Sequence, residues 1–155
     1  MAVDLFDQMH LFKDLSPDQR ELLRPLFISC EYHAGTVLFE QGEPAIFLYL
    51  ILAGEVAIRF KPDDGQTLTI ARVRDGDLVG WSAVIGRRLY TSTAICNEHT
   101  SLLRVRGADL QTLRVLHPET GIMVIERLAT VVAPRLQGSH LQVIAILEYG
   151  LSNGN

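Results

Sequence analysis

Residues 76–96, GDLVGWSAVIGRRLYTSTAIC, decide how we interpret the rest of this chain. Within them, Gly80 follows a short apolar pair and precedes residues that favour the start of a helical turn. A glycine before a helix start offers unpaired backbone N–H groups and the positive end of a dipole, which suits a bound anion. Arg87 and Arg88 could donate charge-assisted hydrogen bonds to the same anion. The stretch also fits a tight strand–helix–strand connection with two solvated arginines.

Short β-prone segments, separated by glycine turns, surround this stretch on both sides. Alternation places Val56, Ile58 and Phe60 on one face of their segment, and we expect Leu68 and Ile70 to face inward from the next one. Many short strands with regular turns and no long helix between them predict an antiparallel sandwich or jelly roll. The expected strands are 28–33, 36–40, 47–53, 55–60, 67–74, 90–95 and 101–105.

Helices are predicted before the β region. Apolar residues at helical spacing indicate a short amphipathic helix within residues 2–10. A second helix is expected to start at Ser16, because serine caps helices, Pro17 suits the first helical position, and Gln19 completes a capping box.

Helices are also predicted after the β region, with a short one at 108–115 and a long tract beyond Pro118. Pro134 is expected to kink or break this tract. The chain is thus predicted to be a single, mainly β domain with flanking helices. Its parts are N-terminal helices at 2–27, an antiparallel double-stranded β-helix (jelly roll) at 28–106, and C-terminal helices at 108–149.

The C-terminal tract is more apolar than one helix face requires. The apolar positions at helical spacing are Ile122, Ile125, Leu128, Ala129 and Val132, and residues 141–147 are mostly apolar as well. Such a segment needs a partner, which is either its own barrel or a second subunit. We expect a homodimer through residues 122–147, and packing in cis is the alternative.

The composition excludes several classes of protein. A chain of 155 residues, 48% apolar and 21% charged, suits one globular domain with a real core. The net charge of −4 gives no electrostatic footprint for nucleic acid, and no apolar run is long enough to cross a membrane. Cys30 and Cys96 are too few for a disulfide framework, which favours two thiols in a reducing cytoplasm.

Residue types that carry catalysis are scattered. The five histidines form no His-x-His pair, so the histidine cluster of a metal-dependent jelly-roll enzyme is not expected. The carboxylates at Asp63, Asp64, Asp75 and Asp77 flank turn glycines, which favours a role in turns. We therefore predict no enzymatic activity, and we expect no metal, haem or iron–sulfur cluster.

The order of these elements, together with several local strings, resembles the cyclic nucleotide-binding domain of the catabolite-activator family. The strings are LFKDLSPDQRELL (11–23), HAGTVLFEQGEPA (33–45), FLYLILAGEVAI (47–58), GDLVGWSAV (76–84) and YTSTAIC (90–96). The resemblance implies a ligand-sensing barrel closed by a long helix. Some relatives add a helix-turn-helix; this chain ends a few residues past the helical tract, so we expect no direct DNA binding.

The family's phosphate-binding cassette is altered in this chain. In members that bind cyclic AMP or cyclic GMP, a glutamate that holds the ribose follows the glycine matched by Gly80, and here that position is Trp81. The phosphate-pairing arginine falls on Tyr90, followed by Thr91 and Ser92. An ordinary cyclic nucleotide is therefore not the expected ligand.

Two functions remain open at this stage. The first is a stand-alone sensor in which a small anion meets the N–H groups of Gly80, Ser82 and Ala83, with Arg87 or Arg88 as its charged partner. The second is a degenerate barrel that serves dimerisation or protein docking. An open cavity holding an arginine favours the sensor, whereas a cavity filled by Trp81 favours docking.

Overall fold

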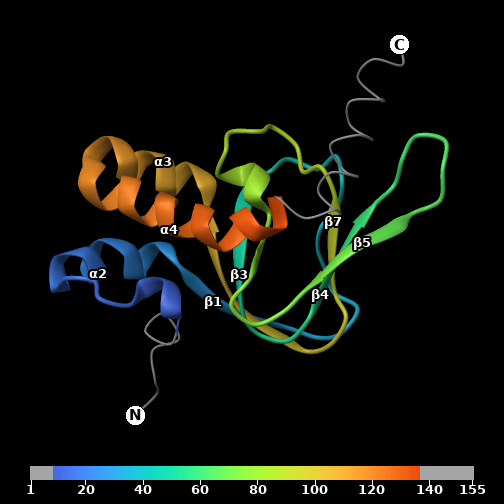
Figure 1. Cartoon of the computed structure of the whole chain (residues 1–155), viewed down its shortest axis with the longest axis horizontal. Helices are drawn as coiled ribbons and strands as arrows, with labels where there is room; N and C mark the ends of the chain where they lie inside the picture. Colours follow the sequence, from blue (N-terminus) through green and yellow to red (C-terminus); the bar gives the residue numbers. More distant parts are fainter. Residues whose placement is uncertain (1–8, 137–155) are drawn as a thin grey trace.

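The computed structural model describes residues 9–136 of the chain, with side chains to Pro134, and shows a β domain with helices gathered at one end (Figure 1). The strands are β1 (Ile28–Tyr32), β2 (Val37–Phe39), β3 (Phe47–Ala53), β4 (Val56–Phe60), β5 (Leu68–Val73), β6 (Leu78–Val79), β7 (Thr93–Cys96) and β8 (Thr100–Arg106). The helices are the 3₁₀ turns η1 (His10–Phe12), η2 (Arg24–Leu26) and η3 (Trp81–Ala83) and the α-helices α2 (Pro17–Leu23), α3 (Gly107–Leu116) and α4 (Pro118–Leu136).

The strands form two four-stranded antiparallel sheets. Their strand orders are β1-β8-β3-β6 and β2-β7-β4-β5. Consecutive strands therefore lie in different sheets, except for β4 and β5, which are neighbours in the same sheet. This is the predicted antiparallel jelly roll with flanking helices, and the predicted fold class is confirmed.

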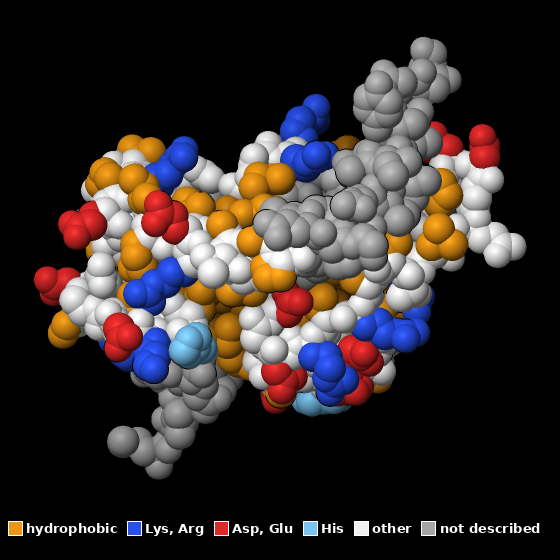
Figure 2. Space-filling model, in the orientation of Figure 1, with side chains coloured by type: hydrophobic (Ala, Val, Ile, Leu, Met, Phe, Trp, Pro, Cys, Tyr) orange, Lys and Arg blue, Asp and Glu red, His pale blue; other side chains and the backbone are white. Residues whose placement is uncertain are grey.

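Charged side chains of both signs are interspersed over the face of the molecule drawn in Figure 2, where hydrophobic side chains gather mainly towards the helical end. Surfaces that bind nucleic acid concentrate basic residues on one face, and this face has no such concentration. Among the described residues, no helix combines the length and the apolar character that a membrane span requires.

The capping box predicted at Ser16 is present. The Ser16 hydroxyl accepts a hydrogen bond from the Gln19 N–H at 3.2 Å, and the Gln19 side chain accepts one from the Ser16 N–H at 3.0 Å. Pro17 occupies the first helical position, as expected. Of the helix predicted within 2–10, residues 2–8 lie outside the described part, and His10 begins the 3₁₀ turn η1 instead.

Two details of the strand prediction are wrong. Leu68 was expected to face inward but is 47% exposed, because β5 pairs only with β4 at the edge of its sheet and the β4–β5 hairpin projects from the body (Figure 1). Val73, at the other end of β5, is the buried residue of that strand. The strand expected at 90–95 begins only at Thr93, because the preceding backbone bonds instead to the turn at 42–43.

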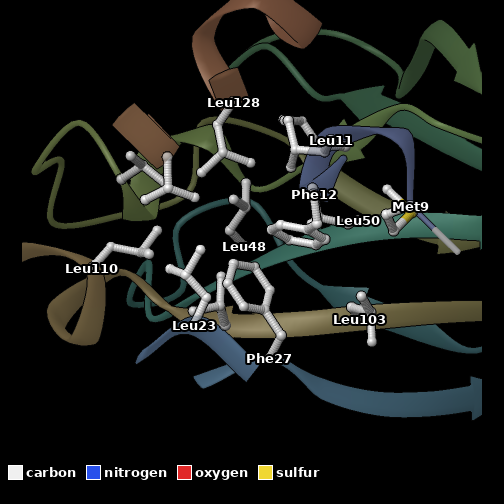
Figure 3. Packing of buried hydrophobic residues seen from close by; sticks show 14 of the residues in the cluster. Met9, Leu11, Phe12, Leu23, Phe27, Leu48, Leu50, Leu103, Leu110 and Leu128 are labelled. Atoms are coloured by element: carbon white, nitrogen blue, oxygen red, sulfur yellow. The ribbon is translucent and has the colours of Figure 1, made fainter. Parts of the chain in front are cut away.

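The apolar residues form two clusters, one on each side of the sheet that contains β3. The helix-side core packs this sheet against η1, α2, α3 and α4, as the side chains of Phe12, Leu48, Leu110 and Leu128 in Figure 3 show. The barrel core lies between the two sheets. Its buried residues are Phe39, Tyr49, Ile51, Val56, Ile58, Val73, Val79, Tyr90, Ala94, Cys96 and Leu102.

Helix α4 directs one face into the helix-side core of its own chain. The buried side chains on this face include Val124, Leu128 and Val132, which follow one another at intervals of four residues. Ile122, which the sequence placed on the apolar face, is 47% exposed. The inward face is rotated in this way because Gly121 sits against α3, where an added Cβ would lie 2.4 Å from the Cα of Arg114. The helix continues through Pro134 to Leu136, the last described residue, so the break expected at Pro134 does not occur.

Leu128 should therefore contribute to the stability of the single subunit. We predict that Leu128→Ala lowers the free energy of unfolding by about 3 kcal/mol, because it leaves a cavity in a fully buried site. Ile122→Ala is the matched control on the same helix and should cost less than about 1 kcal/mol. Urea unfolding followed by circular dichroism measures both values, and equal effects of the two substitutions would contradict the packing in cis.

Candidate ligand-binding cassette

Gly80 connects β6 to the turn η3 in a conformation that favours glycine. Its φ of 88° and ψ of 28° lie in the left-handed region. A Cβ at this position would lie 2.6 Å from the Phe47 carbonyl oxygen, so glycine also permits a close approach to β3. The start of the cassette is thereby pressed against the main chain of the neighbouring strand.

The N–H groups of the turn are partly used by the turn itself. The Ala83 N–H donates to the Gly80 carbonyl at 3.0 Å, and the Val84 N–H donates to the Trp81 carbonyl at 2.9 Å. The side chains of Ser82 and Ala83 are buried. An anion at this turn would therefore have to take the Ala83 N–H from its present acceptor.

Tyr90 occupies the position that the resemblance assigns to the phosphate-pairing arginine, and its side chain points into the barrel core. Its ring stacks on Phe39 with 3.7 Å between centroids and 15° between planes. Its hydroxyl donates to the Phe47 carbonyl at 2.6 Å and accepts from the Phe47 N–H at 2.9 Å. With only 5% of its surface exposed, Tyr90 is an integral part of the barrel core.

The two tyrosines of this core are uncharged at physiological pH. Burial raises the pKa of Tyr90, and the hydrogen bonds from the backbone at Phe47 offset this only in part. Burial also raises the pKa of Tyr49, and the neighbouring Tyr90 adds to the effect. At the position where the resemblance implies an arginine, this chain has a neutral aromatic ring.

Trp81 lies elsewhere. It is partly buried and packs against the helix-side core, which includes Val84, Leu110 and Leu128. The side chain of Gln111 in α3 also donates to the Val84 carbonyl at 2.9 Å. Trp81 was one candidate for the residue that fills the barrel. In the structure Tyr90 fills the barrel, and Trp81 connects the cassette to the helices.

The remaining predicted site residues follow the turn on a surface loop. The side chains of Arg87 and Arg88 are exposed, and Thr91 and Ser92 are partly buried. The Arg88 carbonyl accepts a hydrogen bond from the Ala45 N–H at 2.9 Å, which ties the loop to the segment before β3. Gly80 and Tyr90 thus meet at Phe47, whereas the two arginines lie on the outer surface.

Sequence reasoning missed Arg104, which places a positive charge beside the barrel core. Arg104 is the register partner of Tyr49 in the antiparallel β3–β8 pair, so the two side chains share the barrel-facing side. Its guanidinium carbon lies 4.6 Å from the Phe47 ring centroid. The alternation of side chains along β8 could have predicted this position. Leu103 and Val105 face the helices, so Leu102 and Arg104 face the barrel.

Histidines and carboxylates do not gather into a metal site in the described part of the chain. No group of three or more histidine, cysteine, aspartate or glutamate side chains suited to a metal ion occurs there. The one histidine pair, His33 and His99, has ring centroids 5.8 Å apart, and His99 Nε2 lies 3.6 Å from an exposed Glu31 carboxylate. These contacts belong to a solvated surface, and they offer no arrangement for acid–base catalysis.

The sequence is similar to a known protein family and to characterised proteins. The sequence model of the family described as "Cyclic nucleotide-binding domain" matches residues 29–115. The cyclic AMP receptor protein of Thermus thermophilus is 29% identical over 133 residues, which are 86% of this chain and 60% of that protein. The chain therefore spans less than two thirds of the length of this curated relative.

Two solved structures share the architecture. A cyclic nucleotide-binding domain from Methylobacillus flagellatus has a TM-score of 0.75 at 22% identity, covering 92% of this chain and 80% of that one. The regulatory subunit of a cAMP-independent protein kinase A from Trypanosoma brucei, in a triple variant bound to cAMP, has a TM-score of 0.67 at 18% identity, covering 97% of this chain and 49% of that one.

The double hydrogen bond of Tyr90 can be tested by removing one oxygen atom. We predict that Tyr90→Phe lowers the free energy of unfolding by about 1–3 kcal/mol, because the N–H and carbonyl of Phe47 lose a buried partner. Tyr49→Phe is the matched control, since the Tyr49 hydroxyl makes only one long bond, of 3.4 Å to the Leu38 carbonyl. Thermal and urea unfolding of both variants provide the comparison, and a larger loss in Tyr49→Phe would contradict the role given to Tyr90.

Proposed function

The chain belongs to the cyclic nucleotide-binding domain family. We propose that it is a regulatory module. We also propose that its cassette does not bind cyclic AMP or cyclic GMP in the way that other members of the family do. The observation that carries the proposal is Tyr90, whose ring and hydroxyl occupy the barrel where the resemblance expects an arginine. The role proposed is regulatory and non-enzymatic, in a reducing cytoplasm that keeps both cysteines as free thiols.

The missing charged groups alone weaken cyclic nucleotide binding. A hydrogen bond to a charged group contributes about 1.5–3 kcal/mol. Tyr90 replaces the arginine that pairs with the phosphate, and Trp81 replaces the glutamate that pairs with the ribose. Losing both interactions corresponds to roughly two to four decades in the dissociation constant.

Tyr90 adds a steric obstacle to this loss. To admit a phosphate at its position, the ring would have to leave its stack on Phe39, and the hydroxyl would have to give up both bonds to Phe47. Buried backbone groups that lose their partners are costly. The barrel therefore resists a cyclic nucleotide through its packing as well as through its lack of charge.

A relative of the same fold supports this reasoning. The Trypanosoma regulatory subunit is described as cAMP-independent, and the variant bound to cAMP includes a substitution of threonine by arginine. For the present chain, the resemblance points to Tyr90→Arg as the change that would supply the phosphate contact, together with Trp81→Glu for the ribose contact.

The connection between cassette and helices supports a regulatory role. Trp81 and Val84 pack in the same core as Leu128 of α4, and Gln111 of α3 bonds to the Val84 carbonyl. A displacement of the cassette would therefore be transmitted to the C-terminal helices. Such a coupled element can shift between two arrangements when a ligand or partner prefers one of them.

The ligand class proposed is a small anion other than an ordinary cyclic nucleotide. The predicted contacts at Gly80, Ser82 and Ala83, with Arg87 or Arg88, stay part of this proposal, and they require the exposed arginines to fold back over the turn. The docking alternative is favoured by one observation, the filling of the barrel by Tyr90. The two roles differ in whether any small molecule stabilises the native state.

Cyclic AMP provides the direct test of the proposed function. We expect no heat signal in isothermal titration calorimetry at cyclic AMP concentrations up to about 1 mM, a limit near −4 kcal/mol of binding free energy. The double variant Trp81→Glu/Tyr90→Arg should gain measurable affinity, and Trp81→Glu alone serves as the control with Tyr90 in place. A dissociation constant in the low micromolar range for the unaltered protein would overturn the proposal.

We also propose that two copies associate through residues 122–147. The buried face of α4 is committed to its own chain, so this interface would use the opposite face, where Ile122 is exposed and Ile125 is partly buried. Residues 137–147 lie outside the described part.

Light scattering at tens of micromolar should give twice the subunit mass of 17.3 kDa. Ile122→Asp should shift the mass towards one subunit and leave the circular dichroism spectrum unchanged. Thr112→Asp, at an exposed position on α3, is the control and should remain dimeric. A single-subunit mass for the unaltered protein would contradict the dimer.

A further inference from the structure

Two arginines on β8 share one aromatic ring at the edge of the barrel. The guanidinium carbons of Arg104 and Arg106 lie 4.6 Å and 5.7 Å from the Phe47 ring centroid. The ring holds two like charges side by side through cation–π contacts. The same Phe47 is fixed through its main chain by the Tyr90 hydroxyl, so the platform under the arginines is rigid.

Arg104 carries a donor without an acceptor. Its Nε is buried and has no hydrogen-bond partner among the described residues. Burial raises the pKa of Tyr32, and the nearby guanidinium of Arg104 opposes that rise in part. Buried donors in native structures are nearly always paired, so this unpaired Nε–H is an exception within the described residues.

A cavity of about 130 Å³ opens beside these two side chains. Its lining consists of Pro25, Leu26, Ile28, Phe47, Arg104, Arg106 and Asp109. This is the space of roughly four water molecules, at about 30 Å³ each, and it is smaller than the roughly 300–1,000 Å³ of a site for a drug-sized ligand. An oxyanion of the size of phosphate fits this cavity, and a whole nucleotide does not.

The charge around the cavity favours an anion. The charged residues in its lining are two arginines, Arg104 and Arg106, and one aspartate, Asp109. Helix α3 begins at Gly107, directly after Arg106, so the positive end of its dipole also lies at this edge, and the Gly107 N–H donates to the Ile46 carbonyl at 3.0 Å. Arginine forks match the oxygen geometry of phosphate and carboxylate groups.

We propose that Arg104 and Arg106, held on the Phe47 ring, bind a phosphate-sized oxyanion. The anion is either free phosphate or the terminal phosphate of a larger metabolite whose remainder projects into solvent. The inference deepens the proposed function and rests on it in one respect: it gives the small-anion class proposed for this domain a second source of positive charge, on β8, in the sheet that also contains β6.

Inorganic phosphate is the probe, added at constant ionic strength with chloride as the balancing anion. In ¹H–¹⁵N spectra the Arg104 Nε–H signal, identified by its loss in Arg104→Gln, should shift progressively with phosphate. At about ten times the dissociation constant, phosphate should raise the melting temperature by about 3–6 °C. Glycerol 3-phosphate in a parallel titration distinguishes the sources, because tighter binding of the ester points to a terminal phosphate group.

Substitutions assign the effect to this site. Arg104→Gln and Arg106→Gln should each weaken phosphate binding roughly tenfold or more, which is one charge-assisted hydrogen bond. Asp109→Asn should strengthen it, because it removes the opposing carboxylate. Arg72→Gln, at an exposed arginine of β5, is the control and should leave phosphate binding unchanged.

Two results would overturn the inference. The first is an Arg104 Nε–H signal that does not respond to phosphate, and the second is an equal phosphate effect in Arg104→Gln and Arg72→Gln. If Arg104→Gln fails to fold, Arg106→Gln and Asp109→Asn decide the matter through their opposite expected effects. Because the proposed function is tested with cyclic AMP and with variants at positions 81 and 90, its failure and the failure of this inference are separable.

Discussion

The pair of hydrogen bonds between the Tyr90 hydroxyl and the main chain of Phe47 is the constraint on which the cassette depends. These bonds, of 2.6 Å and 2.9 Å, join the start of β3 to the residue that leads into β7, and so they connect the two sheets. Gly80 approaches the same Phe47 carbonyl from the other side. Both ends of the cassette, Gly80 and Tyr90, therefore contact the main chain of Phe47 in β3. These contacts hold the cassette in its conformation without a bound phosphate.

In this arrangement the barrel core holds neutral aromatic side chains, and the charged side chains lie outside it. A neutral stack of Tyr90 on Phe39 fills the barrel core, while the charged groups lie at its margins, with Arg87 and Arg88 on the surface loop and Arg104 beside Phe47. In this structure the cassette is ordered by the stack of Tyr90 on Phe39 and by the hydrogen bonds of Tyr90 to Phe47. Trp81 and Val84 connect the cassette to the C-terminal helices, and the proposed regulatory role relies on this connection.

Much of this could be predicted from the sequence, because local signals agree with the fold. The capping box at Ser16 and the glycine-punctuated strands depend on neighbouring residues only, and both appear as expected. The predictions that failed depend on contacts between distant segments. The exposure of Leu68 follows from the edge position of β5, and the rotation of α4 follows from the contact of Gly121 with α3. Neither the edge position of β5 nor the contact of Gly121 with α3 can be predicted from the neighbouring residues in the sequence.

The site was predictable in position but not in content. The resemblance of the strings located Gly80 and Tyr90, but of the aromatic residues in the cassette only Trp81 was considered as one that could fill the cavity. The direction of each ring is set by backbone geometry, which turns Trp81 towards the helices and Tyr90 into the barrel. Arg104 was overlooked for a related reason, since its importance arises from cross-strand neighbours, and β3 and β8 are far apart in the sequence.

The central claim, that Tyr90 permanently occupies the place of the phosphate-binding arginine, is tested most directly by the ¹³Cζ resonance of its phenol ring in selectively labelled protein. The resonance, assigned by its loss in Tyr90→Phe, should keep its chemical shift when cyclic AMP is added to millimolar concentration. A progressive change of this resonance with cyclic AMP, at a position that marks a hydroxyl released from Phe47, would contradict the account.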